Sequence, residues 1–132
     1  MELVIGGYAQ GKLNFVLQKN NPENCLICDG MLPDEKQLQK TDIQGKTVII
    51  NHFHEWIKKR LLLGENPEEE IIAFSDKKKE CIIISDEIGN GIVPIDAFER
   101  EYRERTGRIL VRLASEADEV VRVVCGIGQK IK

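Results

Sequence analysis

The stretch ELVIGGYAQGKL, residues 2–13, joins a short apolar run to a glycine-rich loop. Its last eight residues, GGYAQGKL, match seven of the eight positions of the phosphate-binding pattern G-x-x-x-x-G-K-[ST]. In such a loop the glycines let backbone N–H groups surround phosphate oxygens, and the lysine neutralises phosphate charge. An incidental glycine-rich turn is the alternative, but an apolar strand before the loop and a helical pattern after it favour the phosphate loop. The candidate nucleotide-binding residues are Gly6, Gly7, Gln10, Gly11, Lys12 and Leu13.

The eighth position of the pattern is Leu13, where a Ser or Thr hydroxyl would bind Mg²⁺. A second magnesium ligand is usually an acid at the end of a neighbouring strand, but the apolar run VIIN ends in Asn51. The other acids expected near this edge are Asp86 and Glu87, directly after the apolar run CIIIS. We therefore expect Asp86 and Glu87 as the metal ligands, with loop solvation or helix capping as the alternative reading.

Apolar runs alternate with amphipathic stretches along the rest of the chain. This alternation predicts an α/β fold of the P-loop NTPase type, with a mainly parallel sheet and helices on both faces. The C-terminal residues 126–132 are expected to turn back as an antiparallel edge strand, and Gly107 is expected to bend or break the longest helix. Strands are predicted at 2–5, 24–28, 46–51, 81–85 and 118–125, and helices at 12–19, 52–63, from Pro67 onward and at 94–117, with a helical turn after Pro33.

Length and composition bound the class of protein. The 132 residues are 42% hydrophobic and 31% charged, which fits one globular domain spanning residues 1–132. A net charge of −3 makes nucleic acid a poor partner. No secretory signal or membrane-length run is present, so we expect a cytoplasmic protein with reduced cysteines. The chain is short for a sheet covered on both faces, which favours a homo-oligomer.

Two further patterns invite a functional reading. Cys25 and Cys28 form a C-x-x-C match, but a zinc site needs a second pair, so buried structural cysteines are favoured. His52 and His54 follow the strand that ends at Asn51, and for each a helix-start or solvent-facing role is favoured over catalysis. Phe53 and Trp56 are expected in the core or at a subunit interface.

The second half of the chain contains SDEIGNGIVP, a long helical stretch, ADEV and a terminal KIK. It resembles the adenosylcobinamide kinase/adenosylcobinamide-phosphate guanylyltransferase family, which carries Asn-Glu-x-Gly-x-Gly-x-x-Pro, then Gly-Arg, Leu-Ala, Ala-Asp-Glu-Val and a final Gly-x-x-x-x-x-Lys. In the middle, IINHFHEW is similar to the family's strand ending in Asp-Cys-Leu-Thr before a Trp, which aligns Asn51 with the Asp and Trp56 with the Trp. The resemblance covers residues 2–19 and 46–132. Its matches in the second half are Glu87, Gly89, Gly91, Pro94, Gly107, Arg108, Leu113, Ala114, Ala117, Asp118, Glu119, Val120, Gly126 and Lys132.

The resemblance implies a role in cobalamin synthesis. Members of the family phosphorylate adenosylcobinamide and then transfer GMP from GTP through a covalent histidine intermediate, usually as trimers. Carried over by position, Gly6, Gly11 and Lys12 would bind the phosphates of GTP or ATP, and Glu87 would lie beside the reacting groups. Lys12 and Glu87 are therefore the catalytic candidates, with Mg²⁺ as a cofactor.

The sequence departs from the family at three points that bear on the implied kinase and guanylyltransferase activities. Leu13 and Asn51 replace magnesium ligands, and the shortened segment 29–45 holds no histidine. We therefore expect the kinase half-reaction to be more plausible than guanylyl transfer, with weak or absent turnover. The alternatives are a catalytically degenerate protein that binds a nucleotide or corrinoid, and a non-catalytic partner in an oligomer.

Overall fold

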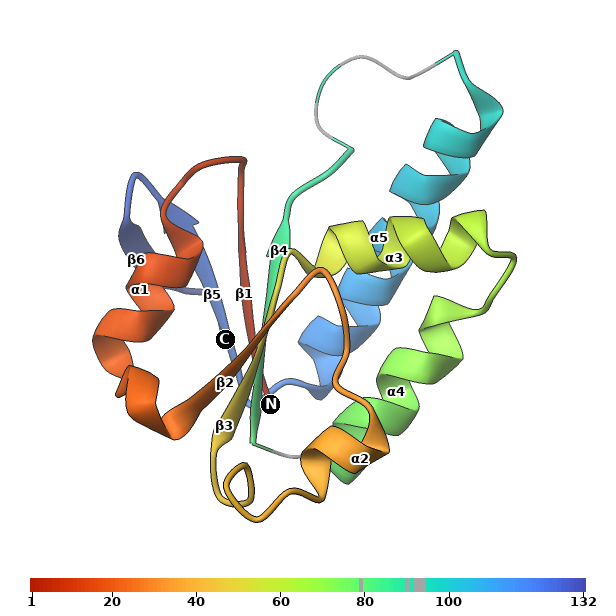
Figure 1. The fold of residues 1–132 in the computed structure, drawn as a ribbon. Helices are drawn as coiled ribbons and strands as arrows, with labels where there is room; N and C mark the ends of the chain where they lie inside the picture. The colour runs from red at the N-terminus through yellow and green to blue at the C-terminus, as the bar shows by residue number, and fades with distance from the viewer. Residues whose placement is uncertain (79, 90, 92–94) are drawn as a thin grey trace.

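The computed structural model describes residues 1–78, 80–89, 91 and 95–132. Within these residues the strands form one sheet in the order β2-β3-β4-β1-β5-β6 (Figure 1). The strands are β1 (Glu2–Gly6), β2 (Cys25–Asp29), β3 (Thr47–Asn51), β4 (Cys81–Asp86), β5 (Glu119–Val124) and β6 (Ile127–Lys130). The helices are α1 (Lys12–Lys19), a 3₁₀ turn (Pro22–Asn24), α2 (Glu35–Leu38), α3 (Phe53–Leu62), α4 (Pro67–Lys77) and α5 (Ala97–Glu116).

The sheet is parallel from β2 to β5, and β6 adds an antiparallel edge. The central strand β1 lies between β4 and β5, where Val4 is in register with Ile84 and Val121. Strands β3 and β4 are buried on both faces, which explains why their sequences, TVIIN and CIIISD, are mostly apolar. The predicted α/β fold with its antiparallel C-terminal edge is confirmed.

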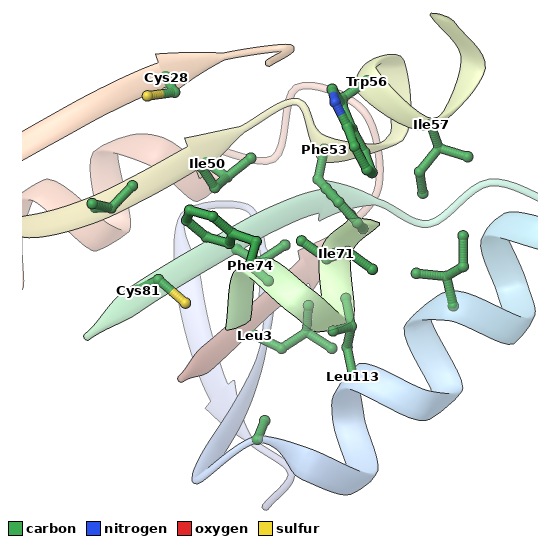
Figure 2. Close-up of a cluster of buried hydrophobic side chains, with 14 of the residues drawn as sticks. Leu3, Cys28, Ile50, Phe53, Trp56, Ile57, Ile71, Phe74, Cys81 and Leu113 are labelled. Atoms are coloured by element: carbon green, nitrogen blue, oxygen red, sulfur yellow. The ribbon is translucent and has the colours of Figure 1, made fainter. Parts of the chain in front are cut away.

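Helices cover both faces of the sheet, but unequally. Helix α1 lies alone on one face, whereas α3, α4 and α5 cover the other (Figure 1). Figure 2 shows the larger apolar cluster, in which Leu3, Ile50 and Ile71 meet between the sheet and these helices. The rings of Phe53 and Trp56 stack there with centroids 5.4 Å apart, so both residues are part of the core.

The longest helix differs from its prediction at two points. Helix α5 passes through Gly107 without interruption, and no atom lies within 4 Å of the position of a Cβ there. A helical glycine costs about 1 kcal/mol, less than the buried contacts of Ile109 and Leu113 on the same helix contribute. The expected helix start at Pro94 lies outside the described residues, and the helix begins at Ala97.

Cys28 and Cys81 lie in the core, Cys25 is half-buried, and Cys125 lies at a turn. Cys28 packs in the larger apolar cluster, whereas Cys25 contacts the smaller cluster on the opposite face, because residues three apart on a strand point to opposite sides. Cys125 was predicted as the last residue of a strand at 118–125, but it lies one residue beyond the end of β5 and is exposed. Together with Gly126 it forms the two-residue turn before β6, with φ angles of 51° and 76°.

Candidate functional site

The loop between β1 and α1 requires glycine at residues 6 and 11, the two glycine positions of the phosphate-binding pattern. A Cβ at Gly6 would lie 2.5 Å from the carbonyl oxygen of Val123, so only glycine lets β1 approach β5 this closely. Gly11 has a φ of 82°, a left-handed conformation that glycine adopts without steric cost, and α1 starts at the next residue. The loop therefore has the local geometry that its sequence predicted.

The loop is also held by the turn between β5 and β6. The backbone oxygen of Gln10 accepts a hydrogen bond from the N–H of Gly126, and its side-chain Oε1 accepts one from the N–H of Cys125, both at 2.8 Å. The side chain of Gln10 is thus used to tie two loops together. This contact fixes the shape of the loop from outside.

A cavity of about 330 Å³ opens between this loop and the carboxyl ends of β3 and β4. It is lined by residues 8–14 together with Asn51, His52, Ile84 and Asp86. Four of the predicted nucleotide-binding residues therefore lie around it: Gln10, Gly11, Lys12 and Leu13. The other two, Gly6 and Gly7, form the start of the loop and do not line the cavity.

Lys12 is buried at the base of this cavity, with 7% of its side chain exposed. Its Nζ atom donates a hydrogen bond to the carbonyl oxygen of Gly7 at 2.6 Å and lies 2.7 Å from Oδ1 of Asp86. The positive charge of Lys12 is therefore neutralised by the carboxylate of Asp86. An incoming phosphate would have to compete with Gly7 and Asp86 for Lys12.

His54 holds Asp86 from the opposite side. Its Nδ1 atom accepts a hydrogen bond from the backbone N–H of Asp86 at 3.1 Å, and its Nε2 atom lies 3.4 Å from Oδ2 of the same residue. Burial lowers the pKa of His54, although the charge of Asp86 opposes this shift. The imidazole is therefore neutral, with its proton on Nε2, and it orients both the backbone and the carboxylate of Asp86.

A second imidazole lies at the edge of the cavity. The Nδ1 atom of His52 is 2.5 Å from Oδ1 of Asp29, and Nδ2 of Asn51 donates to the same oxygen at 3.1 Å. His52 adopts a φ of 50°, which costs a non-glycine residue about 1–2 kcal/mol. Asp29, which was not among the predicted site residues, is in register with Asn51 across the β2–β3 pair. The sequence carries only a weak signal for it, an acid directly after the apolar run 25–28, because the register between β2 and β3 is set by tertiary pairing.

Glu87 points away from the cavity. Its backbone N–H donates to the carbonyl oxygen of Gly6 at 2.8 Å, but its carboxylate pairs with Arg122 at 3.1 Å. Its side chain borders a different hollow, beside Ile5 and Ile88 on the face that carries α5. Of the two predicted metal ligands, the structure therefore brings Asp86 to the phosphate loop and not Glu87.

The cavity offers limited support for Mg²⁺. Asp86 provides one carboxylate, and Leu13 has no oxygen in its side chain. The side-chain amide nitrogen of Asn51 donates a hydrogen bond to Asp29. Among the described residues, no group of three or more His, Cys, Asp or Glu side chains could hold a metal ion. Magnesium in nucleotide sites usually takes only one or two carboxylates, with phosphate oxygens and water completing its shell. Asp86 fits that limited role.

Comparison with known proteins adds independent information. A family model described as cobinamide kinase/cobinamide phosphate guanyltransferase matches residues 18–131. The bifunctional adenosylcobalamin biosynthesis protein CobU of Salmonella typhimurium is 49% identical over 53 residues, and its Escherichia coli counterpart is 45% identical over 53 residues. Each alignment covers 40% of this chain and 29% of the relative. The phosphate loop at residues 6–13 precedes the part that the family model matches.

None of the helices in the described residues is both long and apolar enough to cross a bilayer.

Proposed function

The chain belongs to the cobinamide kinase/cobinamide phosphate guanyltransferase family, and from that premise we propose that it binds GTP or ATP and transfers the terminal phosphate to cobinamide. The observation that carries the proposal is the position of Lys12. Its ammonium group lies at the start of α1, inside a cavity that also contains the carboxylate of Asp86. A phosphoryl-transfer site needs this combination of a cation for the phosphates and an acid for the metal.

Each part of the cavity has a role in this proposal. The backbone N–H groups of the loop and the N-terminal end of α1 would bind the phosphate oxygens. Lys12 would move from Gly7 and Asp86 onto the phosphates. Asp86 would then hold Mg²⁺, which when bound neutralises charge on the β- and γ-phosphate oxygens.

Two observations favour the kinase half-reaction over guanylyl transfer. The residues that replace the family's histidine-bearing segment, 29–45, contain no histidine. His54 has both ring nitrogens engaged with Asp86, so it has no free lone pair for attack on a phosphate. Phosphate transfer to a hydroxyl group needs no covalent intermediate on the protein, so it is the simpler reaction for this chain.

Nucleotide binding without chemistry is the second candidate. It is favoured by Leu13, which lines the cavity and has no side-chain oxygen where a magnesium ligand is expected. The ion pair between Lys12 and Asp86 also occupies both groups in the absence of ligand. A protein of this kind would bind GTP or ATP and not turn it over.

Calorimetry with GTP, ATP and adenosylcobinamide, each with and without Mg²⁺, together with an assay of phosphate transfer, distinguishes these candidates. We expect nucleotide binding that Mg²⁺ strengthens, and a loss of that binding in Lys12→Ala. Lys19→Ala is the matched control, because Lys19 lies at the other end of the same helix. Nucleotide binding without phosphate transfer would favour the second candidate. If the chain bound none of the three compounds, both candidates would be contradicted. The remaining hypothesis would then be a non-catalytic partner in an oligomer.

The same family premise leads us to propose a homo-oligomer, with a trimer as the expected state. Light scattering of the purified chain measures its mass directly against the 15.0 kDa of one copy. A mass near that of one copy at micromolar concentration would contradict this part of the proposal.

A further inference from the structure

We propose that His52, oriented by Asp29, is the general base that accepts the proton of the acceptor hydroxyl during phosphate transfer. The inference rests on the proposed kinase function and assigns a role to a pair of residues within it. It follows from three observations: the tautomer of His52, its position at the cavity, and the contacts that already occupy the neighbouring titratable groups.

The tautomer follows from the contact with Asp29. A carboxylate accepts hydrogen bonds and does not donate them, so the 2.5 Å contact requires a proton on Nδ1 of His52. In the neutral imidazole the lone pair is then on Nε2. No group among the described residues forms a hydrogen bond with Nε2, so this nitrogen is available to a ligand. Asn51 donates to the same carboxylate oxygen and keeps Asp29 in place.

The position of His52 at the cavity is the second observation. His52 lines the cavity that contains Lys12 and Asp86, and 43% of its side chain is exposed. It follows β3 directly, at the edge of the sheet where the strand ends and the phosphate loop converge. An acceptor that entered this cavity to reach a phosphate on Lys12 would pass the imidazole.

The other titratable groups nearby are already engaged. His54 lies with its ring centre 5.8 Å from that of His52, but it uses both nitrogens on Asp86. Asp86 is paired with Lys12, and Glu87 is paired with Arg122 away from the cavity. An imidazole backed by a carboxylate is a common arrangement for proton transfer, because the carboxylate stabilises the imidazolium that forms.

The step balances without any further reagent. The O–H bond of the acceptor breaks and its proton moves to Nε2 of His52. The acceptor oxygen forms a bond to the γ-phosphorus, and the bond from that phosphorus to the β–γ bridging oxygen breaks. The nucleoside diphosphate leaves, and the imidazolium returns its proton to water.

The test compares His52→Gly with the unaltered protein in phosphate transfer from GTP or ATP to adenosylcobinamide. Glycine accepts the φ of 50° without strain, so this variant should fold. We expect kcat to fall by about 10²–10⁴-fold, the usual contribution of a general base. The nucleotide dissociation constant should change little, and added imidazole should restore part of the lost turnover.

Two variants on β2 and the segment after it complete the test. Asp29→Asn should lower kcat less than His52→Gly does, and imidazole should not rescue it, because the ring is still present. Asp42→Asn is the matched control, since Asp42 is an exposed acid in a turn of the same segment. It should leave turnover unchanged.

Four results would overturn the inference. The first is a kcat of His52→Gly close to that of the unaltered protein. The second is a lost kcat that imidazole does not restore, which would indicate a structural role. The third is a nucleotide covalently attached to His52, detected by mass spectrometry. The fourth is nucleotide binding with no transfer in the unaltered protein. A failure to bind any nucleotide would instead overturn the proposed function together with the inference.

Discussion

The ammonium group of Lys12 and the carboxylate of Asp86 form a buried ion pair, with 2.7 Å between Nζ and Oδ1. The pair joins the phosphate loop to the end of β4. The acid paired with Lys12 thus lies at the end of β4, the strand beside β3. Strand β3 itself ends in Asn51, which carries no charge. This arrangement gives the lysine a partner in the absence of ligand and gives the cavity one carboxylate.

The first prediction concerns that carboxylate. Asp86→Asn should raise the affinity for nucleotide without metal, because Lys12 is released to bind phosphate, and it should abolish the strengthening by Mg²⁺. Calorimetry with and without Mg²⁺ measures both effects. The variant should also lose about 1–3 kcal/mol in free energy of unfolding, since a buried charge loses its partner. An unchanged response to Mg²⁺ would exclude Asp86 as the metal ligand.

The second prediction concerns the close approach of β1 and β5. Gly6→Ala should lower the free energy of unfolding by about 1–3 kcal/mol, because its Cβ would lie 2.5 Å from the carbonyl oxygen of Val123. Gly107→Ala is the control, because nothing lies within 4 Å of its Cβ position, and it should stabilise the protein by about 0.5–1 kcal/mol. Urea denaturation measures both. Equal effects of the two substitutions would contradict the prediction.

The third prediction concerns Leu13, which stands where the phosphate-binding pattern has a Ser or Thr hydroxyl. Leu13→Ser should increase both the affinity for Mg²⁺–nucleotide and the rate of phosphate transfer, because a serine oxygen at this position can bind the metal. Leu13→Ala is the matched control, since it removes the same apolar contacts without adding an oxygen. The two variants should therefore differ in their response to Mg²⁺ and share a similar loss of stability. Identical nucleotide binding by both would contradict the prediction.

The fourth prediction concerns pH and the α4–α5 contact. Arg105 forms two hydrogen bonds of 2.7 Å with the carboxylate of Glu68, and these bonds lower the pKa of Glu68 below its ordinary value of 4.5. The stabilisation is therefore present at neutral pH and is lost as the pH falls through the folded-state pKa. Because 35% of the Glu68 side chain is exposed, we expect only about 0.5–1 kcal/mol.

Glu69→Gln is the control for that contact, because Glu69 is exposed on the same helix. At pH 7, Glu68→Gln should be less stable than Glu69→Gln by this amount. The difference should shrink as the pH is lowered below 4.5 and approach zero in strong acid. A difference that stays constant from pH 7 to acid would show that the contact does not act through charge.

Much of the fold could be predicted from the sequence because the signals are local. The apolar run at residues 81–85 predicted a central strand, and the helix from Lys12 to Lys19 begins and ends as its spacing indicates. The expected break at Gly107 was the main error, because α5 is continuous from Ala97 to Glu116. The packing of Ile109 and Leu113 in the larger apolar cluster, which supports the continuous helix, depends on tertiary contacts that no local pattern records.

The candidate site could be predicted only in part. The glycine-rich loop and Asp86 were predicted from motif and position, and the structure places Lys12 of the loop beside Asp86; that they bind phosphate and metal stays a prediction. The sequence placed Asp86 and Glu87 together, but β4 continues through Asp86, so strand alternation directs their side chains to opposite faces. The positions of Asp29 and His54 depend on register between strands and on helix packing. Neither could be read from residues next to them in the chain.

The central claim is that the cavity around Lys12 transfers phosphate, and one assay tests it most directly. Phosphate transfer from GTP and from ATP to adenosylcobinamide should be followed at saturating Mg²⁺ for the unaltered chain, Lys12→Ala and Lys19→Ala. We predict slow Mg²⁺-dependent phosphorylation, in line with the missing ligands at Leu13 and Asn51, that Lys12→Ala abolishes and Lys19→Ala preserves. Bound nucleotide with no phosphorylated product, or equal product from Lys12→Ala, would contradict the claim.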